Sequence, residues 1–439
     1  VYKSVHLYYS PLDIFEHPFV FKSGVNVESN TRVVVTGMGV VAPNGIGLDA
    51  FWDSLITCKS GVGPITLFDS SDIPLKIAGE VHDFDLRDYF GKDCKPHRLA
   101  RQTQLALVAC KMALENAGLT ADFLRKECPL SLVIGICSGA VDITEQAKEI
   151  LMTRGAARVR PHIVGSCQPH AIGAALVQLL GVQTSVTTIS AACPSGLDAV
   201  AAASRMIKLG QTDVVIVGAS DSPLNISTVA SFCAAGIPSV TKEFPPEEVS
   251  RPFDAKRSGA VLAEGSGFLV LERLDGAIAR GAVPLMEIIG GATISDTPGT
   301  LGMEGMYHSM GAAILNAGLY PEQIDYICAN AVSDPAGDRI ETEWVKKRFG
   351  KRAYQIPISS IRGVMGHPLA PAGMFQLIAC ALSLKNQMII PTANLHNPDP
   401  ACDLDYVPLA PRHAHLSVLM ANGHGMGGEN STLIVKRLG

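Results

Sequence analysis

A cysteine between small residues is the first feature of the sequence that could do chemistry. Cys193 follows the apolar run 187–189 and three small residues, and it precedes Pro194, Ser195, Gly196 and an Ala-rich stretch. Small neighbours permit a sharp strand-to-helix turn, and the free N–H groups and dipole of a helix N-terminus favour a thiolate. The sequence therefore predicts a nucleophilic thiol at position 193, with a buried inert cysteine as the alternative.

Two glycine-flanked histidines could assist such a thiol. His367 precedes a second Ala-rich stretch, and an imidazole near a thiol can carry a proton or stabilise an oxyanion. The Gly-rich turn 423–428, which contains His424 and Met426, is expected to expose backbone N–H groups suited to an oxyanion hole. Each feature has a simpler alternative, which is a solvent-facing histidine at 367 and a plain flexible turn at 423–428.

Motifs for cofactors and metals are weak in this sequence. Residues 37–42 imitate a dinucleotide-binding fingerprint, but Pro43 and Asn44 stand where the helix should begin. The chain contains no P-loop, and the Cys and His residues at 167, 170, 413 and 415 lack partners at metal-ligand spacing. We therefore expect neither a cofactor nor a metal.

The composition limits the class of protein. The chain has 439 residues, 36 Lys plus Arg against 41 Asp plus Glu, and scattered basic residues, which argues against a nucleic-acid binder. With 47% hydrophobic and 18% charged residues it should fold to a large core and present an oligomer interface. No apolar run reaches membrane-spanning length, and eleven irregularly spaced cysteines indicate a reducing compartment. We expect a soluble, cytoplasmic protein.

The basic stretch 154–160 is a solvated face or a docking site for an acidic protein.

Apolar β-rich runs alternate with Ala-rich stretches along the chain, which predicts sheets covered on both faces by helices. The expected strands are 33–36, 132–136, 186–189, 214–217, 268–271, 285–289, 324–328, 356–359, 416–420 and 432–435. The expected helices are 102–117, 197–209, 306–317 and 372–385. The glycines at 37 and 39 are expected to end the first strand in a tight turn.

The pattern of 214–218 followed by 264–272 is echoed by 416–420 followed by 429–436. This echo favours two fused, similar halves, although strand-loop-strand patterns also recur in α/β proteins without duplication. We predict an N-terminal tail over 1–31, a first half over 32–285 that carries the cysteine, and a second half over 286–439 that carries the histidine and the Gly-rich turn.

Taken together and in this order, the three segments around Cys193, His367 and 423–428 resemble the elongating β-ketoacyl-ACP synthases, the condensing enzymes of the thiolase superfamily. The resemblance runs from about Arg32 to Leu438, with supporting motifs at 34–39, 251–254, 263–265, 397–399 and 402–408. It implies a thiolase-like, five-layered α-β-α-β-α fold of two duplicated halves, usually as a homodimer.

The resemblance also implies roles for single residues. Cys193 would accept an acyl group from an acyl-carrier protein or a CoA thioester. The N–H groups of Cys193 and Met426 would form the oxyanion hole, and His367 would be one of the family's two active-site histidines.

The sequence departs from the family pattern at several positions. The other family histidine lies in an Asn-Ala-His-Gly-Thr stretch, but here Val332 stands in its place, and segment 330–338 is two residues shorter. Arg362 replaces a family lysine with a bulkier, fixed cation. His424 and Met426 replace two phenylalanines of the Gly-rich turn.

The kept cysteine and missing histidine resemble the non-elongating ketosynthases, which pass acyl groups on without making a carbon–carbon bond. This resemblance implies a ketosynthase-like acyltransferase of fatty acid or polyketide biosynthesis, in which loss of one polar donor slows decarboxylative condensation by about 10² or more. One alternative is that His424 substitutes for the missing imidazole and condensation is retained. Another is a non-catalytic, chain-length-setting subunit of a ketosynthase heterodimer, against which the retained Cys193 and His367 weigh. The partners expected are an acyl-carrier protein or acyl-CoA and a second ketosynthase-like chain, identical or different.

Overall fold

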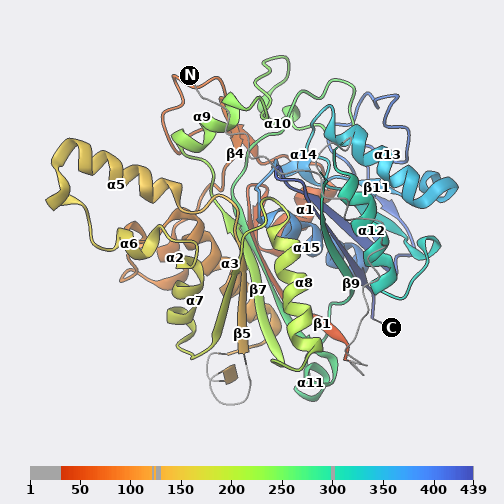
Figure 1. Ribbon diagram of the computed structural model, residues 1–439, viewed down its shortest axis with the longest axis horizontal. Helices are drawn as coiled ribbons and strands as arrows, with labels where there is room; N and C mark the ends of the chain where they lie inside the picture. The colour runs from red at the N-terminus through yellow and green to blue at the C-terminus, as the bar shows by residue number, and fades with distance from the viewer. Residues whose placement is uncertain (1–30, 121–122, 125–129, 298–301, 439) are drawn as a thin grey trace, which may run out of the picture. The chain divides into compact units, whose positions relative to one another are not determined.

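The computed structural model describes residues 31–120, 123–124, 130–297 and 302–438 (Figure 1). The predicted tail 1–31 lies outside the described residues apart from Thr31. The described chain alternates strands and helices, as expected from runs of β-branched residues separated by Ala-rich stretches.

The first set of five strands comes from the chain before residue 274. These strands are β1 (Val33–Ala42), β5 (Leu130–Gly135), β6 (Ser185–Ile189), β7 (Val214–Asp221) and β8 (Gly265–Arg273). They lie in the order β6-β5-β7-β8-β1. β5 pairs in parallel with β6 and β7, whereas β8 is antiparallel to both β7 and β1.

The second set of five strands repeats this arrangement. These strands are β9 (Met286–Ser295), β10 (Tyr326–Cys328), β11 (Ile358–Ser359), β14 (Val418–His424) and β15 (Glu429–Lys436). Their order β11-β10-β14-β15-β9 matches that of the first set strand for strand, with the same parallel and antiparallel neighbours. A short pairing of β1 with β9, through Val34 and Val35, joins the two sets. The shared topology agrees with two similar halves.

Helices form layers on both sides of each set of strands (Figure 1). α8 (Ser195–Lys208) packs on β5 and β7, α15 (Pro371–Asn386) packs on β14 and β8, and the two helices contact each other between the sheets. α3 (Arg101–Ala117) covers the outer face of the first set, with α7 (Ala171–Leu180) beside it, and α12 (Glu304–Asn316) and α13 (Gly337–Phe349) lie outside the second. Nearly all of α15 is buried, as an internal helix requires.

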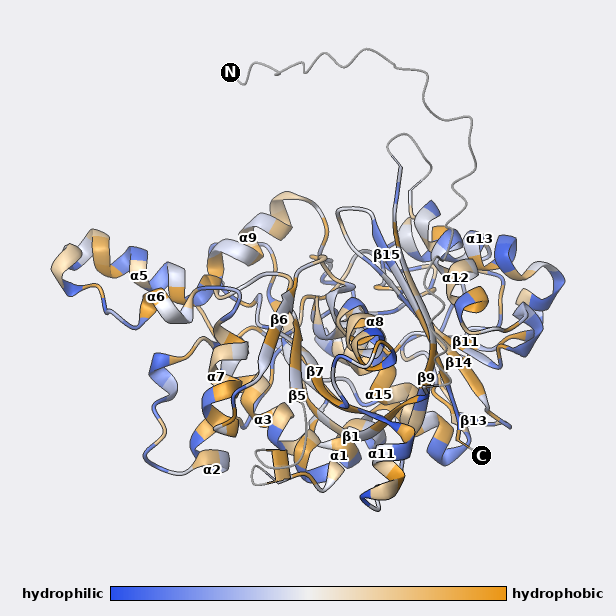
Figure 2. Cartoon of the chain, turned by 60° about the horizontal axis from the view of Figure 1, so that its bottom comes forward, coloured by the Kyte–Doolittle hydropathy of each residue, from blue (hydrophilic) through white to orange (hydrophobic). Residues whose placement is uncertain are grey.

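The remaining elements are shorter or lie at the margins. They are β2 (Gly45–Ile46), α1 (Leu48–Ile56), β3 (Val62–Pro64), β4 (Ile77–Gly79), α2 (Leu86–Phe90), α5 (Val141–Arg154), α6 (Ile163–Ser166), α9 (Ile226–Ala234), α10 (Pro246–Val249), α11 (Leu274–Ala279), α14 (Arg362–Met365), β12 (Met388–Ile389) and β13 (Arg412–His413). Apolar residues concentrate along the central strands and on the buried faces of the helices (Figure 2). None of the helices in the described part of the chain is both long and apolar enough to cross a membrane.

The ten predicted strands and four predicted helices are all present, with bounds shifted by a few residues. The predicted turn at residues 37–39 is wrong, because β1 continues to Ala42. The two glycines instead allow helix α3 to pack closely against strand β1. A Cβ at Gly37 would lie 2.2 Å from the Ala113 carbonyl oxygen of α3, and one at Gly39 would lie 2.0 Å from that of Ala109. The sequence signal for a turn was therefore a signal for tight helix-on-strand packing.

The close packing of α3 on β1 predicts how a methyl group added at Gly39 changes the stability of the protein. Gly39→Ala should destabilise the protein by about 1–3 kcal/mol, because the new Cβ meets backbone that cannot rotate away. Gly276→Ala is the matched control: its Cβ meets nothing within 4 Å in helix α11, so stability should be unchanged or rise slightly. Urea unfolding followed by circular dichroism measures both. Equal midpoints for Gly39→Ala and the unaltered chain would contradict the packing argument.

Candidate active site

Cys193 lies in a tight elbow between strand β6 and helix α8. The preceding Ala192 has a φ of 53°, in the left-handed region that side chains rarely adopt. Ser195 closes the elbow, because its Oγ accepts the Ala191 N–H at 2.8 Å and lies 2.6 Å from the Ala192 carbonyl oxygen. The strand-to-helix turn expected from the small residues is present, and it places the thiol one residue before the helix N-cap, Pro194.

His367 is held beside the elbow by its backbone. Its N–H donates to the Val261 carbonyl at 2.7 Å, and its own carbonyl accepts the Ala263 N–H at 3.0 Å. Gly366, with a φ of 77°, permits this approach, since a Cβ there would lie 2.7 Å from the Val261 oxygen. The charge and hydrogen bonding of the imidazole lower the pKa of the Cys193 thiol. The imidazole is buried, and its Nδ1 has no partner among the described residues.

The Gly-rich turn 423–428 packs directly against the elbow. A Cβ at Gly425 would lie 2.9 Å from the Cβ of Ala192 and 3.0 Å from Pro194 Cδ, so only glycine allows the contact. Within the described residues, neither the Cys193 N–H nor the Met426 N–H has a hydrogen-bond acceptor. The Met426 side chain itself is 63% exposed. This turn therefore brings a second free N–H to the elbow while its side chain faces outward.

His424 ends strand β14, and Asn430 fixes its tautomer. The Asn430 amide nitrogen donates to the carbonyl oxygen of Gly428 at 2.8 Å and to Asp296 Oδ1 at 2.9 Å, so its Oδ1 must accept. That oxygen lies 2.8 Å from His424 Nδ1. The proton of the neutral ring is therefore on Nδ1, which leaves Nε2 as a free acceptor.

The charges around Cys193 favour its thiolate. The pKa of Cys193 is lowered well below its usual range, first by a hydrogen bond from the Cys137 thiol and then by the charge and hydrogen bond of His367. The charge that His424 carries when its ring is protonated acts in the same direction, and burial opposes all three. The same interaction raises the pKa of Cys137, together with burial and the nearby carboxylate of Asp221. Cys137 is therefore the protonated donor and Cys193 the thiolate acceptor.

Asp221, the last residue of β7, holds the loops around the thiols together. Its carboxylate accepts the N–H groups of Cys137 at 3.0 Å, Ser138 at 3.0 Å and Ala370 at 3.1 Å, and also the Ser138 hydroxyl at 2.8 Å. Burial raises the pKa of Asp221 to about 7, and these four donors act against that rise. One side chain thereby fixes both the turn after β5 and the loop that carries His367.

Arg362 lies behind the site, at the start of α14. It is buried, its Nε and Nη1 have no partner among the described residues, and its Nη2 lies 3.4 Å from Gln376 Oε1. Burial lowers the pKa of Arg362 to about 10, which leaves it cationic at neutral pH. The Glu341 carboxylate accepts the N–H groups of Asn330 and Ala331, so it fixes the loop before the partly exposed Val332. No imidazole lies on that loop.

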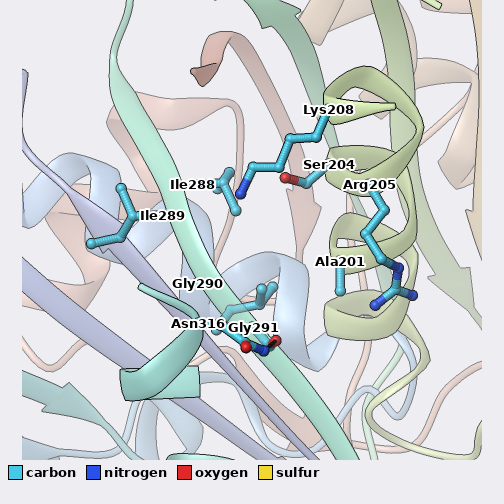
Figure 3. A pocket seen from close by; sticks show the side chains of 10 residues that line it. Ala201, Ser204, Arg205, Lys208, Ile288, Ile289, Gly290, Gly291 and Asn316 are labelled. Carbon is cyan, nitrogen blue, oxygen red and sulfur yellow. Dashed lines mark hydrogen bonds between the residues drawn. The ribbon is translucent and has the colours of Figure 1, made fainter. Parts of the chain in front are cut away.

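The five predicted site residues are thus arranged around one sulfur atom. His367 and His424 lower the pKa of Cys193, the Arg362 cation interacts with the charge of its thiolate, and the turn that carries Met426 packs on its elbow. A separate cavity of about 260 Å³ lies at the other end of α8, lined by Arg205 and Lys208 (Figure 3) and by none of these five residues. No group of three or more potential metal ligands is found in the part of the chain that the structure describes.

Family models identify the chain. The N-terminal domain of beta-ketoacyl synthases matches residues 30–277, and their C-terminal domain matches residues 289–396. The chain belongs to the beta-ketoacyl synthase family. As a ketosynthase of fatty acid or type II polyketide synthesis, it has the thiolase-like fold in which two similar halves enclose the helix that follows the cysteine.

Relatives of this ketosynthase come from both pathways. It is 36% identical to the tetracenomycin polyketide synthase ketoacyl synthase alpha subunit of Streptomyces glaucescens, over 92% of this chain and 97% of that one. It is 34% identical to 3-oxoacyl-[acyl-carrier-protein] synthase 2 of Synechocystis sp., over 92% and 98%. Among solved structures, the ishigamide ketosynthase/chain length factor matches with a TM-score of 0.86 at 28% identity, over 93% of this chain and 100% of the other.

Sequence reasoning missed three residues that shape the site. Asp221 accepts hydrogen bonds from groups far away in the chain, Asn430 orients His424 from the neighbouring strand β15, and Cys137 interacts with Cys193 across the paired strands β5 and β6. A polar residue at the end of an apolar strand was the available signal for Asp221, since such residues often face a site at the carboxyl edge of a parallel sheet. Nothing in the sequence distinguished Cys137 from the other cysteines.

The thiolate at position 193 predicts an unusual alkylation profile. The rate of its reaction with iodoacetamide should stay within about twofold between pH about 6.5 and 8.5, whereas an ordinary thiol would rise about 50-fold. His367→Asn should restore a rise with pH, because it removes a charge and a hydrogen bond that lower the pKa. Peptide mapping follows Cys193 alone, and Cys110, whose pKa burial raises to about 12, serves as an internal unreactive control. A 50-fold rise at Cys193 itself would exclude a resident thiolate.

Proposed function

We propose that this ketosynthase loads an acyl group from a carrier-protein or CoA thioester onto Cys193 and transfers it onward. The observation that carries the proposal is the tight elbow that buries Cys193 before helix α8, in surroundings that lower the pKa of its thiol well below the usual range. A thiolate is the reactive form of cysteine, and transfer between thioesters needs little further driving force.

The first step follows from the arrangement of donors. The Cys193 sulfur attacks the thioester carbon, a new C–S bond forms, and negative charge develops on the carbonyl oxygen. The free N–H groups of Cys193 and Met426 can donate to that oxygen, and removal of one such donor typically costs 10²–10³-fold in rate. The tetrahedral intermediate then expels the carrier thiolate, and His367 is placed to supply its proton.

Condensation makes an additional demand on the site. Decarboxylation of a malonyl thioester builds an enolate, which needs polar donors on the malonyl carbonyl. His367 can supply one, but the aliphatic Val332 cannot supply the second. We therefore propose that decarboxylative condensation is impaired while acyl loading is retained.

One observation favours a second candidate function, active condensation. Asn430 holds His424 as the Nδ1–H tautomer, and a charge on His424 lowers the pKa of Cys193, which supports a second imidazole near the sulfur. When protonated at Nε2, that ring could donate to the malonyl carbonyl. In its neutral form Nε2 only accepts, so Asn430 favours a proton acceptor over the donor that an enolate requires. For this reason acyl transfer remains the primary proposal.

A purely structural, chain-length-setting role has less support. Such a subunit needs no reactive thiol, whereas here the elbow, His367 and the charges on Cys193 together favour a thiolate. The relation to the ishigamide ketosynthase/chain length factor leaves a second ketosynthase chain as a partner that this protein could take.

Acyl loading is tested by intact mass. Incubation with octanoyl-CoA or with octanoyl-loaded carrier protein should add one octanoyl group, removable by hydroxylamine, because a thioester is cleaved by that nucleophile. Cys193→Ala should remove the adduct, and the matched control Cys233→Ser, in α9, should load like the unaltered protein. His367→Ala should slow loading by about 10²-fold. If no acyl-CoA or acyl-carrier protein gives an adduct on Cys193, the proposed function is wrong.

The condensation defect is tested by restoring the imidazole. Val332→His should raise malonyl-carrier-protein decarboxylation by about 10²-fold or more, the typical contribution of one acid–base group. Val332→Ala, which changes size without adding a donor, should leave the rate low. The second candidate predicts the opposite pattern, with efficient carbon–carbon bond formation by the unaltered protein and its loss in His424→Phe. Carbon dioxide release and product mass distinguish the two.

A further inference from the structure

A second thiol, that of Cys137, interacts with the Cys193 sulfur. It follows strand β5 directly, and β5 pairs in parallel with β6, the strand that leads to Cys193. The Ile136 N–H continues that pairing, donating to the Ile189 carbonyl at 2.9 Å. The two cysteines therefore leave the same edge of the sheet from adjacent strands.

Further contacts fix the two loops to each other. Ser195 Oγ lies 3.0 Å from the Ile136 carbonyl oxygen, which joins the residue before Cys137 to the elbow. A Cβ at Gly135 would lie 2.6 Å from the Ser195 carbonyl oxygen, so the two backbones are packed without space between them. On the other side, Asp221 holds the Cys137 N–H. The backbone thus holds the two loops that carry the thiols against each other, and the Cys193 sulfur raises the pKa of Cys137 across this contact.

We propose that Cys137 and Cys193 form a reversible intramolecular disulfide when the protein meets a peroxide, so that position 137 is the resolving thiol of a covalent modification site. The inference goes beyond the proposed function and does not require acyl transfer. It requires only that the Cys193 sulfur is nucleophilic and that the Cys137 sulfur, held on the adjoining loop, can reach it.

The chemistry balances in two steps. The Cys193 thiolate attacks hydrogen peroxide, an S–O bond forms, the O–O bond breaks, and the leaving hydroxide takes a proton to become water. The Cys137 thiol then gives up its proton, its sulfur attacks the Cys193 sulfur, the S–O bond breaks, and a second water leaves. Two cysteine sulfurs are oxidised, and one peroxide is reduced to two water molecules.

The surroundings allow each step. Cys137 is only half-buried, and hydrogen peroxide is small and uncharged, so the oxidant can approach. The Cys193 thiolate helps to hold the proton on Cys137, as do Asp221 and Glu429. Once Cys193 is oxidised to the neutral sulfenic acid, its negative charge no longer raises the pKa of Cys137. Cys137 can then release its proton more readily. The first oxidation thereby prepares the second thiol.

The disulfide would have two consequences for this site. It occupies the sulfur that would carry an acyl group, so loading stops until a thiol reductant restores the pair. It also removes the sulfenic acid before further peroxide can convert it to the irreversible sulfinic acid.

The test uses the full chain, reduced and then treated with a small excess of hydrogen peroxide. Non-reducing peptide mapping should find a Cys137–Cys193 linked peptide, about 2 Da lighter than its two reduced parts. Dithiothreitol should then restore iodoacetamide labelling of Cys193. In Cys137→Ser and Cys137→Ala, Cys193 should instead gain about 32 Da as sulfinic acid, and its labelling after dithiothreitol should be recovered at least about fivefold less.

Cys233→Ser, matched in residue type but placed in α9, should behave like the unaltered protein. The proposal is overturned if the mapped peptides show Cys193 oxidised to sulfinic acid at the same rate with and without Cys137, or linked to a different cysteine. Peptide mapping of the unaltered chain decides the matter even if a variant at 137 fails to fold. A linked peptide without acyl loading would leave this inference standing and reject the proposed function, so the two can fail separately.

Discussion

The left-handed backbone of Ala192 is the constraint on which the rest of the site depends. A chain that leaves strand β6 must reverse within three residues to present a side chain at the N-terminus of α8, and for an L-residue the left-handed conformation costs about 1–2 kcal/mol. Ser195 offsets that cost, because one hydroxyl binds the turn on both sides and reaches strand β5. Replacing the elbow with a relaxed turn would move the sulfur away from the free N–H groups that make it useful.

Much of the fold followed from the sequence because burial on both faces leaves a simple pattern. Strands such as β1 and β7 are buried along their whole length and begin with runs of Val and Ile, so their position could be predicted without knowing their neighbours. The glycines at 37 and 39 were misread as a turn, since a missing side chain permits either a turn or a close contact, and only the position of α3 decides between them. The elbow was predictable for a related reason, because small residues, a cysteine and an Ala-rich helix all lie within one local segment.

The charges that tune the thiol were not predictable in the same way. The pKa of Cys193 depends on Cys137, His367 and His424, which come from three strand ends far apart in the chain. Each of these contacts requires the sheet order to be known first. The buried cation of Arg362 and the buried carboxylate of Glu341 add two further charges to the site, and burial raises the pKa of Glu341. Because several charges share one water-poor site, a substitution at any of them changes the protonation of the others.

The duplication explains why the site has this composition. In each half, three parallel strands end at the same edge, and the loops after them supply the chemistry. The first half contributes Cys137 after β5, Cys193 after β6 and Asp221 at the end of β7; the second contributes Val332 after β10, His367 after β11 and His424 at the end of β14. Thus Cys193 and His367 lie on loops that follow equivalent strands, as do Cys137 and Val332. The loop after β5 therefore carries a thiol that lowers the pKa of Cys193, whereas its counterpart after β10 carries an aliphatic side chain that can neither donate nor accept a proton.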